Sequence, residues 1–177
     1  MRRRSFLTLS AGAMSSTVSP AQSSVPAKAS FVVAGQDRSN QPHNMGITTN
    51  NFKVSGKETG GGLFALEQTF RERGGPPRHL HPNQDEWFYA VEGTFEFEIG
   101  ESKFSLHSGD SILAPRNVPH VWAFVGTGQG RILVSFSPAG KMEAFFEHIA
   151  ASHSMPPQTP DLWSSYDMQL LGPPLKV

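Results

Sequence analysis

The 177-residue chain contains no cysteine. Disulfide bonds and thiolate ligands are therefore excluded, and any bound metal must be held by nitrogen and oxygen donors. No apolar run approaches the roughly 20 residues that a membrane-spanning helix needs, so no membrane span is expected. Basic and acidic residues are balanced, with 15 Lys+Arg and 15 Asp+Glu. A chain without a basic excess or a basic stripe is a poor candidate for binding nucleic acid.

Acidic residues are also missing from residues 1–29, which contain three consecutive arginines followed by a weakly apolar stretch and small residues. This is the organisation of a signal peptide. The segment Arg3–Leu7 resembles a twin-arginine export signal. We expect cleavage after Ala29 or, as a second candidate, after Ala21, and a periplasmic or secreted mature protein. The alternative is a basic leader with no export role. Removal of residues 1–29 leaves 11 Lys+Arg against 15 Asp+Glu, so the mature chain is mildly acidic.

From residue 63 onward, short segments rich in β-forming residues are separated by Gly, Pro and Asn, a pattern typical of an all-β sandwich or barrel. The predicted strands are 63–71, 78–81, 86–92, 94–99, 102–107, 111–114, 120–126 and 130–137. They belong to a barrel core over residues 62–140.

Two further parts flank this core. Residues 30–61 are polar and glycine-rich, and we expect one or two short strands there, at 31–33 and 52–54. Residues 141–177 form a C-terminal helix and an arm: apolar residues recur at helical spacing as far as 152. The proline-rich remainder is expected to be extended, with a short helical turn near 162–168.

Period-two alternation assigns the strand faces. If Glu86 points inward, Phe88 and Ala90 do so as well. The expected core of the following strands comprises Phe95, Phe97, Ile99, Phe104 and Leu106. Trp87, Tyr89 and Val91 then face away from the interior. Because these three are also apolar, the N-terminal strands, the C-terminal helix or a second subunit must cover them. We expect a second subunit, and hence a homodimer.

Three histidines and one glutamate form the strongest functional signal. His79 and His81 are two residues apart on a strand and project from one face. A turn through Pro82 and Asn83 lets Glu86 return to that face, and His120 can complete the set from a more distant strand. Three imidazoles and a carboxylate suit one divalent metal ion, with Fe, Mn, Ni, Cu, Co and Zn all possible.

The same residues carry a family resemblance. The run His79-x-His81-x4-Glu86-x6-Gly93 resembles the first cupin motif, and Gly109-x5-Pro115-x4-His120 resembles the second. The chain is similar to cupins over about residues 60–140, and its LGPPL tail is similar to quercetin-dioxygenase-like cupins with a single domain. The resemblance implies an all-β fold, the cupin double-stranded β-helix or jelly-roll barrel, and all four metal ligands.

The chain departs from the cupin pattern at three places. The glycine expected just before the first histidine comes one residue late, at Gly74 and Gly75. Asn117 replaces a glycine, and Phe124 stands where the second motif usually has asparagine. None of these changes removes a ligand. The Phe124 change bears on the shape and polarity of the pocket.

The resemblance further implies a metal-dependent dioxygenase that acts on a small aromatic or enolisable compound, with O₂ as co-substrate. Glu86 is then either a static ligand or a general base that takes the substrate hydroxyl proton. Phe88, Trp122 and Phe124 are the candidate pocket residues, although they could also simply fill the core. The alternatives are a metal-dependent isomerase or lyase that does not use O₂, and a binding protein without catalysis. The intact ligand set argues against the last, because buried polar groups without a partner cost about 1–3 kcal/mol each.

The remaining histidines are weaker candidates. His107 should face solvent, and His43, His148 and His153 fall outside the two motifs. Asp85 has the wrong parity to share the face of the ligands, and we expect a turn or supporting role for it.

Overall fold

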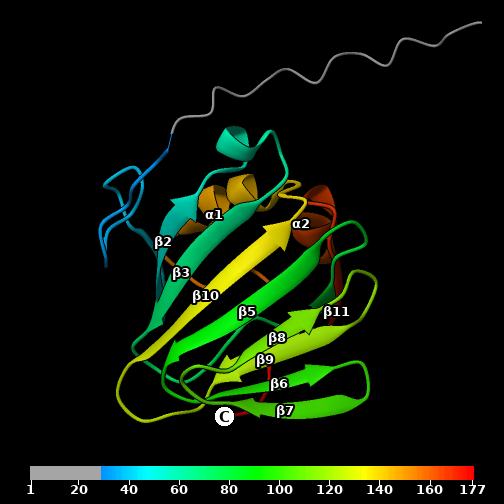
Figure 1. Cartoon of the computed structure of the whole chain (residues 1–177). Helices are drawn as coiled ribbons and strands as arrows, with labels where there is room; N and C mark the ends of the chain where they lie inside the picture. The colour runs from blue at the N-terminus through cyan, green and yellow to red at the C-terminus, as the bar shows by residue number, and fades with distance from the viewer. Residues whose placement is uncertain (1–28) are drawn as a thin grey trace, which may run out of the picture.

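The computed structural model describes residues 29–177, so the expected export signal lies outside the described residues apart from Ala29. The chain forms two antiparallel sheets, with the strand orders β1-β2-β3-β10-β5-β8 and β11-β4-β9-β6-β7 (Figure 1). The strands are β1 His43–Met45, β2 Thr48–Val54, β3 Phe64–Phe70, β4 Arg78–Leu80, β5 Asp85–Glu92, β6 Phe95–Ile99, β7 Ser102–Leu106, β8 Ser111–Ala114, β9 His120–Phe124, β10 Gly130–Ser137 and β11 Gln169–Gly172. The helices are η1 Gly56–Thr59, α1 Met142–Ala150 and α2 Pro160–Ser165. The predicted all-β cupin jelly-roll fold is confirmed.

Inward-facing aromatic residues fill the space between the two sheets. On β5, Phe88 and Ala90 are fully buried, as the alternation predicts, and so are Phe95 and Phe97 on β6. Phe88 meets Phe97 edge-on, with ring centroids 4.9 Å apart. Burial of such large apolar side chains is the main stabilising contribution, about 1.5–3 kcal/mol for each fully buried residue.

Phe104 does not belong to this core, contrary to the sequence-based expectation. It is 42% exposed, whereas Leu106 on the same strand is buried. The strand that carries it, β7, is the outermost strand of its sheet, and all of its residues except Leu106 are exposed.

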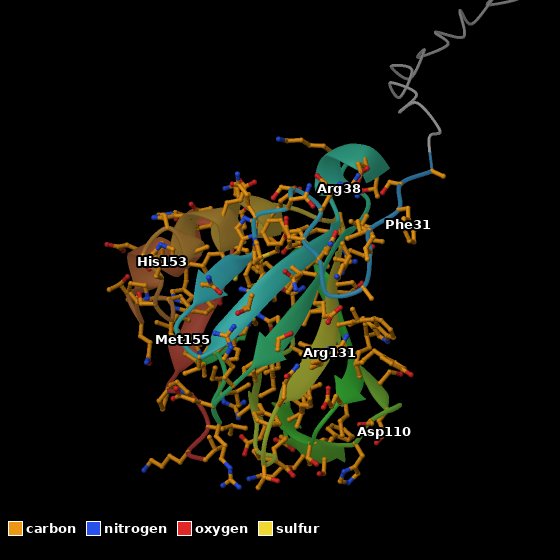
Figure 2. The ribbon with its side chains drawn as sticks, turned by 90° about the vertical axis from the view of Figure 1, so that its left-hand side faces the viewer. Phe31, Arg38, Asp110, Arg131, His153 and Met155 are labelled. Atoms are coloured by element: carbon orange, nitrogen blue, oxygen red, sulfur yellow. The ribbon has the colours of Figure 1, made fainter. Side chains whose placement is uncertain are left out.

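The N-terminal part differs from the prediction. Residues 31–33 form no strand, and Phe31 is 90% exposed at the surface (Figure 2). The expected strand at 52–54 is the end of the longer β2, and β1 was not predicted. The sequence of β1, HNM, has a single apolar residue. It is a strand because it pairs with β2, and this pairing cannot be read from its amino-acid composition.

The C-terminal part packs against the site-bearing strands. The two helices lie together at one end of the sheets (Figure 1), where Phe145 of α1 and Trp163 of α2 have ring centroids 5.5 Å apart. The expected extended arm contains the strand β11, which pairs with β4 and places Leu170 opposite His79. No helix among residues 29–177 is long and apolar enough to cross a membrane.

Candidate metal centre

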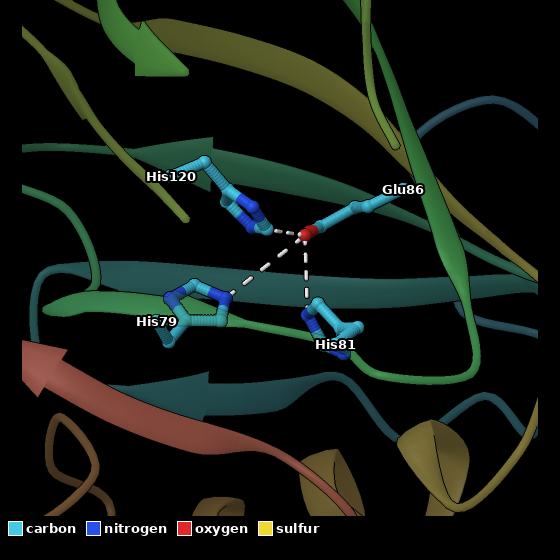
Figure 3. A group of neighbouring side chains, drawn as sticks. All are labelled: His79, His81, Glu86 and His120. Carbon is cyan, nitrogen blue, oxygen red and sulfur yellow. Dashed lines mark hydrogen bonds and ion pairs between the residues drawn. The ribbon is translucent and has the colours of Figure 1, made fainter. Parts of the chain in front are cut away.

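Three separate chain segments bring the four predicted ligands together. His79 lies on β4, His81 just after it, Glu86 near the start of β5 and His120 at the start of β9. Strands β4 and β9 pair with each other, and His79 lies directly opposite His120 in this pairing. All four side chains are buried, and one potential ligand atom from each lies within 4.8 Å of all the others (Figure 3). The β-sheet register therefore produces the cluster that the sequence spacing predicts.

One carboxylate oxygen lies at the centre of the cluster. Glu86 Oε2 is 2.9 Å from His120 Nε2, 3.3 Å from His81 Nε2 and 4.0 Å from His79 Nε2 (Figure 3). All three imidazoles thus present the same nitrogen to the carboxylate. This is the arrangement expected of a three-histidine, one-glutamate metal site.

The outer ring nitrogens fix the orientation of two of these histidines. His79 Nδ1 is 2.7 Å from the Pro77 carbonyl oxygen, and His120 Nδ1 is 3.1 Å from that of Val118. A carbonyl only accepts, so both rings carry their proton on Nδ1 and leave the Nε2 lone pair facing inward. Such outer hydrogen bonds are the usual supports of metal-bound histidines.

This tautomer leaves a conflict that a cation resolves. A neutral imidazole has one N–H, so His120 cannot donate both to Val118 and to Glu86. Its bare Nε2 would instead face a carboxylate oxygen at 2.9 Å. Neither ring nitrogen of His81, moreover, has a hydrogen-bond partner within residues 29–177. Lone pairs and a carboxylate directed at one point fit a divalent cation, and the donor set fits the metal that the sequence predicts.

The protonation states also suit metal binding, which needs neutral imidazoles and an ionised carboxylate. Burial, with His120 and His81 nearby, lowers the pKa of His79 well below its ordinary value. Burial alone would raise the pKa of Glu86, but His120 and His81 lower it below its usual range when they face it with a protonated Nε2. A cation at the same point would act in the same direction, because an adjacent positive charge favours the ionised carboxylate. At neutral pH the cluster therefore contains a carboxylate and at least one neutral imidazole.

A small cavity of about 40 Å³ adjoins the cluster. Of the three predicted pocket residues, Trp122 lines this cavity, whereas Phe88 and Phe124 do not and are buried in the aromatic core. These two rings fill the core, which is the alternative that the sequence left open. Phe145 and Trp163, from the two helices, also line the cavity.

The three departures from the cupin pattern now have physical reasons. A side chain at Gly75 would place its Cβ 2.0 Å from the Trp122 carbonyl oxygen, so this late glycine lets the chain pass close to β9. Asn117 has a φ of 62°, a left-handed conformation that asparagine tolerates better than most residues. The Phe124 ring occupies the space beside Gly130, where a Cβ would lie 2.4 Å from it.

The other titratable residues lie outside the cluster. His107 is exposed, as predicted. His43 stacks on Phe52 with centroids 4.0 Å apart, and His148 pairs with the Tyr166 hydroxyl. Asp85 accepts hydrogen bonds from the backbone and guanidinium of Arg116, which lowers the pKa of Asp85 to about 2. This pair ties the start of β5 to the turn before His120.

Among the cavity residues that were not predicted, two groups are informative. The first is Gln68 on β3. The sequence could have revealed it, because Gln68 is the one polar residue in the inward-facing row that it forms with Phe64, Leu66 and Phe70. The second consists of the four methionines of the described chain, all of which line the cavity: Met45, Met142, Met155 and Met168. Their positions depend on how the C-terminal segment packs, which the sequence pattern does not indicate.

Parts of this chain are similar in sequence to known proteins. Residues 66–136 match the family model described as the cupin domain. Polyketide synthase CurC of Streptomyces cyaneus is 30% identical over 60 residues, 34% of this chain and 39% of that protein. Protein SchB of Streptomyces halstedii is 28% identical over 60 residues, again 34% of this chain and 44% of that protein. The chain thus matches less than half the length of each of these relatives.

Two solved structures have a similar fold at low sequence identity. KdgF from Halomonas sp. has 22% identity and a TM-score of 0.53, with 63% of this chain and 94% of that chain covered. An RmlC-like cupin from Shewanella frigidimarina NCIMB 400 has 22% identity and a TM-score of 0.52, with 66% and 96% covered. The chain thus contains a segment that matches the cupin domain, includes the buried three-histidine, one-glutamate cluster and has the fold of these two structures.

Proposed function

We propose that this protein is a metal-dependent cupin oxygenase, a dioxygenase that acts on a small aromatic or enolisable compound. The observation that carries the proposal is the open-sided donor set: His79, His81, Glu86 and His120 converge on one point, and a cavity with apolar walls adjoins them. Four protein ligands leave one or two positions free on a five- or six-coordinate metal, whereas structural sites are closed.

A bound Fe, Mn, Ni or Cu ion would supply a site at which an anionic oxygen donor and O₂ can react together. The chain's own residues prepare that site. The Nδ1 hydrogen bonds of His79 and His120 hold these rings in place. Phe145, Phe146 and Trp163 give the cavity an aromatic wall.

Glu86 is the candidate proton acceptor, although the lowered pKa that keeps it ionised also makes it a weak base. Its carboxylate is ionised at neutral pH and lies at the cavity wall. If Oε2 turns toward the substrate, it can take the hydroxyl proton of an enol, which strengthens the substrate as an oxygen ligand. In the alternative, Glu86 is a static ligand and the substrate binds already ionised.

The name of one relative supports the substrate class. CurC is a polyketide synthase by name, and polyketide chains carry repeated carbonyl groups that enolise readily. The same name also favours a second candidate, a metal-dependent isomerase or lyase that rearranges a carbonyl compound without O₂. Both candidates use the same metal centre, and O₂ consumption separates them.

Elemental analysis of protein purified from its native compartment, followed by O₂ uptake with a panel of flavonols and diketones, tests the proposal. We expect one divalent metal per chain and O₂ uptake that the Glu86→Gln variant lacks. A loaded protein that converts a diketone without consuming O₂ would favour the isomerase or lyase. A protein that binds no divalent metal would contradict both.

We further propose that the mature protein is an exported homodimer. The export proposal depends on Arg3–Leu7 and the small residues before Ala29.

The dimer proposal depends on β5, where the rings of Trp87 and Tyr89 stack with centroids 6.0 Å apart and Trp87 remains 38% exposed. Residues 29–177 leave this side chain open, so a second subunit is the proposed cover.

A further inference from the structure

Gln68 is a polar side chain in an otherwise apolar inward row. Its neighbours on the same face of β3, Leu66 and Phe70, are buried. Gln68 is itself only 6% exposed and lines the metal cavity. Its Oε1 has no hydrogen-bond partner among the residues that the structure describes. Burying an amide oxygen without a partner is unfavourable, so this position is better explained if a bound molecule supplies the partner.

Trp122 offers the complementary group. It follows His120 by two residues on β9, so the two side chains lie on the same face of the strand. Its ring stacks on Phe97, with centroids 5.6 Å apart and an interplanar angle of 14°, and meets Phe88 edge-on. This packing fixes the orientation of the indole. The Nε1 group can only donate, and it has no acceptor within residues 29–177.

We propose that Gln68 and Trp122 are a pair of positioning residues that orient the substrate beside the metal. Gln68 accepts a hydrogen bond from an N–H or O–H of the substrate, and Trp122 donates one to a substrate oxygen. The inference rests on the proposed function, because the substrate must bind at the metal. It narrows the substrate class to small molecules that chelate the metal through two oxygens and carry one further hydrogen-bond donor, as carbonyl compounds with two hydroxyl groups do: one hydroxyl oxygen and the carbonyl chelate, and the second hydroxyl donates.

Ordered water is the competing partner for both groups. The cavity of about 40 Å³ is large enough for it, since one water needs only about 10–15 Å³. A larger ligand fits only if side chains in the cavity wall move. The wall contains Met155, which lies at the margin of the fold (Figure 2), and methionine adapts easily to different shapes. Water would satisfy the two groups, but it would not make binding depend on a donor in the ligand.

Two hydroxamates distinguish these possibilities in the full chain loaded with Zn(II). Acetohydroxamate chelates zinc through two oxygens and retains an N–H, whereas N-methylacetohydroxamate lacks it. Isothermal titration of both gives their Kd ratio for the wild type and for the near-isosteric Gln68→Met variant. We expect the wild type to prefer acetohydroxamate by about two- to tenfold, the range for one neutral hydrogen bond. The variant should lose this preference, and Trp122→Phe should weaken both ligands.

Asn51→Leu is the matched control. Asn51 is also 6% exposed, and its Oδ1 also lacks a partner among the described residues. It pairs with Glu67 and therefore lies on the opposite face of the sheet from Gln68. This variant should keep the ligand preference. If Gln68→Met keeps it too, the bulk of the N-methyl group causes the preference and the inference is overturned. Wild-type protein that binds zinc but neither hydroxamate overturns the inference alone, whereas failure to bind zinc overturns the proposed function with it.

Discussion

The backbone N–H of Asn117 donates a hydrogen bond to the carbonyl oxygen of His81, with an N–O distance of 2.9 Å. The Asn117 side-chain amide adds a second bond, to the Pro82 carbonyl oxygen at 3.2 Å. These bonds join the turn that follows the first two histidines to the turn that precedes His120. The two halves of the candidate metal centre are therefore held together by hydrogen bonds within the protein.

Replacement of Asn117 tests this connection. Because the residue has a positive φ, Asn117→Val should lower the free energy of unfolding by about 1–2 kcal/mol, the cost of a left-handed conformation for a residue with a bulky side chain. Asn117→Gly should cost less, since glycine adopts this conformation freely. Urea unfolding of the metal-free proteins measures both values. Equal losses in the two variants would show that backbone conformation is not the reason for asparagine here.

Replacement of His81 tests the metal centre. His81→Ala should remove tight metal binding, taking the metal content from about one ion per chain to near zero, because three ligands remain with a gap beside Glu86. The β fold should persist, since Phe95 and Phe97 are buried without any contribution from the metal. Metal analysis and circular dichroism measure the two effects, with exposed His107→Ala as the control. Loss of the β signal would mean that the site is structural.

Replacement of Phe124 tests its assignment to the core. Phe124→Ala should lower the free energy of unfolding by about 3–5 kcal/mol, the usual range for a buried phenylalanine. The metal affinity should be unchanged, because Phe124 does not line the cavity. Exposed Phe104→Ala, on the edge strand β7, is the matched control and should cost under about 1 kcal/mol. A large loss of metal affinity in Phe124→Ala would place its ring in the site after all.

The proposed dimer is tested through Trp87. Light scattering on the mature protein at micromolar concentration should give twice the chain mass, and Trp87→Glu should give the monomer, because a charge would be buried in the interface. Leu171→Glu, at an exposed apolar position on β11, should leave the dimer intact. A monomeric wild type would refute the dimer.

The proposed export is tested by N-terminal sequencing of the native protein. We expect a mature terminus near residue 30 in the periplasmic or secreted fraction, and an Arg3→Lys, Arg4→Lys variant that stays in the cytoplasm with its leader attached. An intact Met1 or Arg2 terminus on wild-type cytosolic protein would contradict export.

The sequence by itself determined the strands from residue 63 to 137 and the four clustered side chains. Both depend on short-range geometry: alternation fixes which residues share a face, and a spacing of two places His79 and His81 together. Even the departure at Asn117 could be related to a turn, because asparagine has a local preference for such conformations.

Only the tertiary structure decided which residues surround the metal centre. The sequence offered Phe88, Trp122 and Phe124 as candidate pocket residues. Of these only Trp122 lines the cavity, together with Gln68 and Trp163, which were not predicted. Strand β11 and the exposed position of Phe104 were likewise hidden. These features depend on which strands pair and on which one ends a sheet, and such contacts join residues far apart in the chain. The local alternation of apolar and polar residues cannot predict these contacts. It shows which face of a strand a side chain lies on, but not which residues pack against that face.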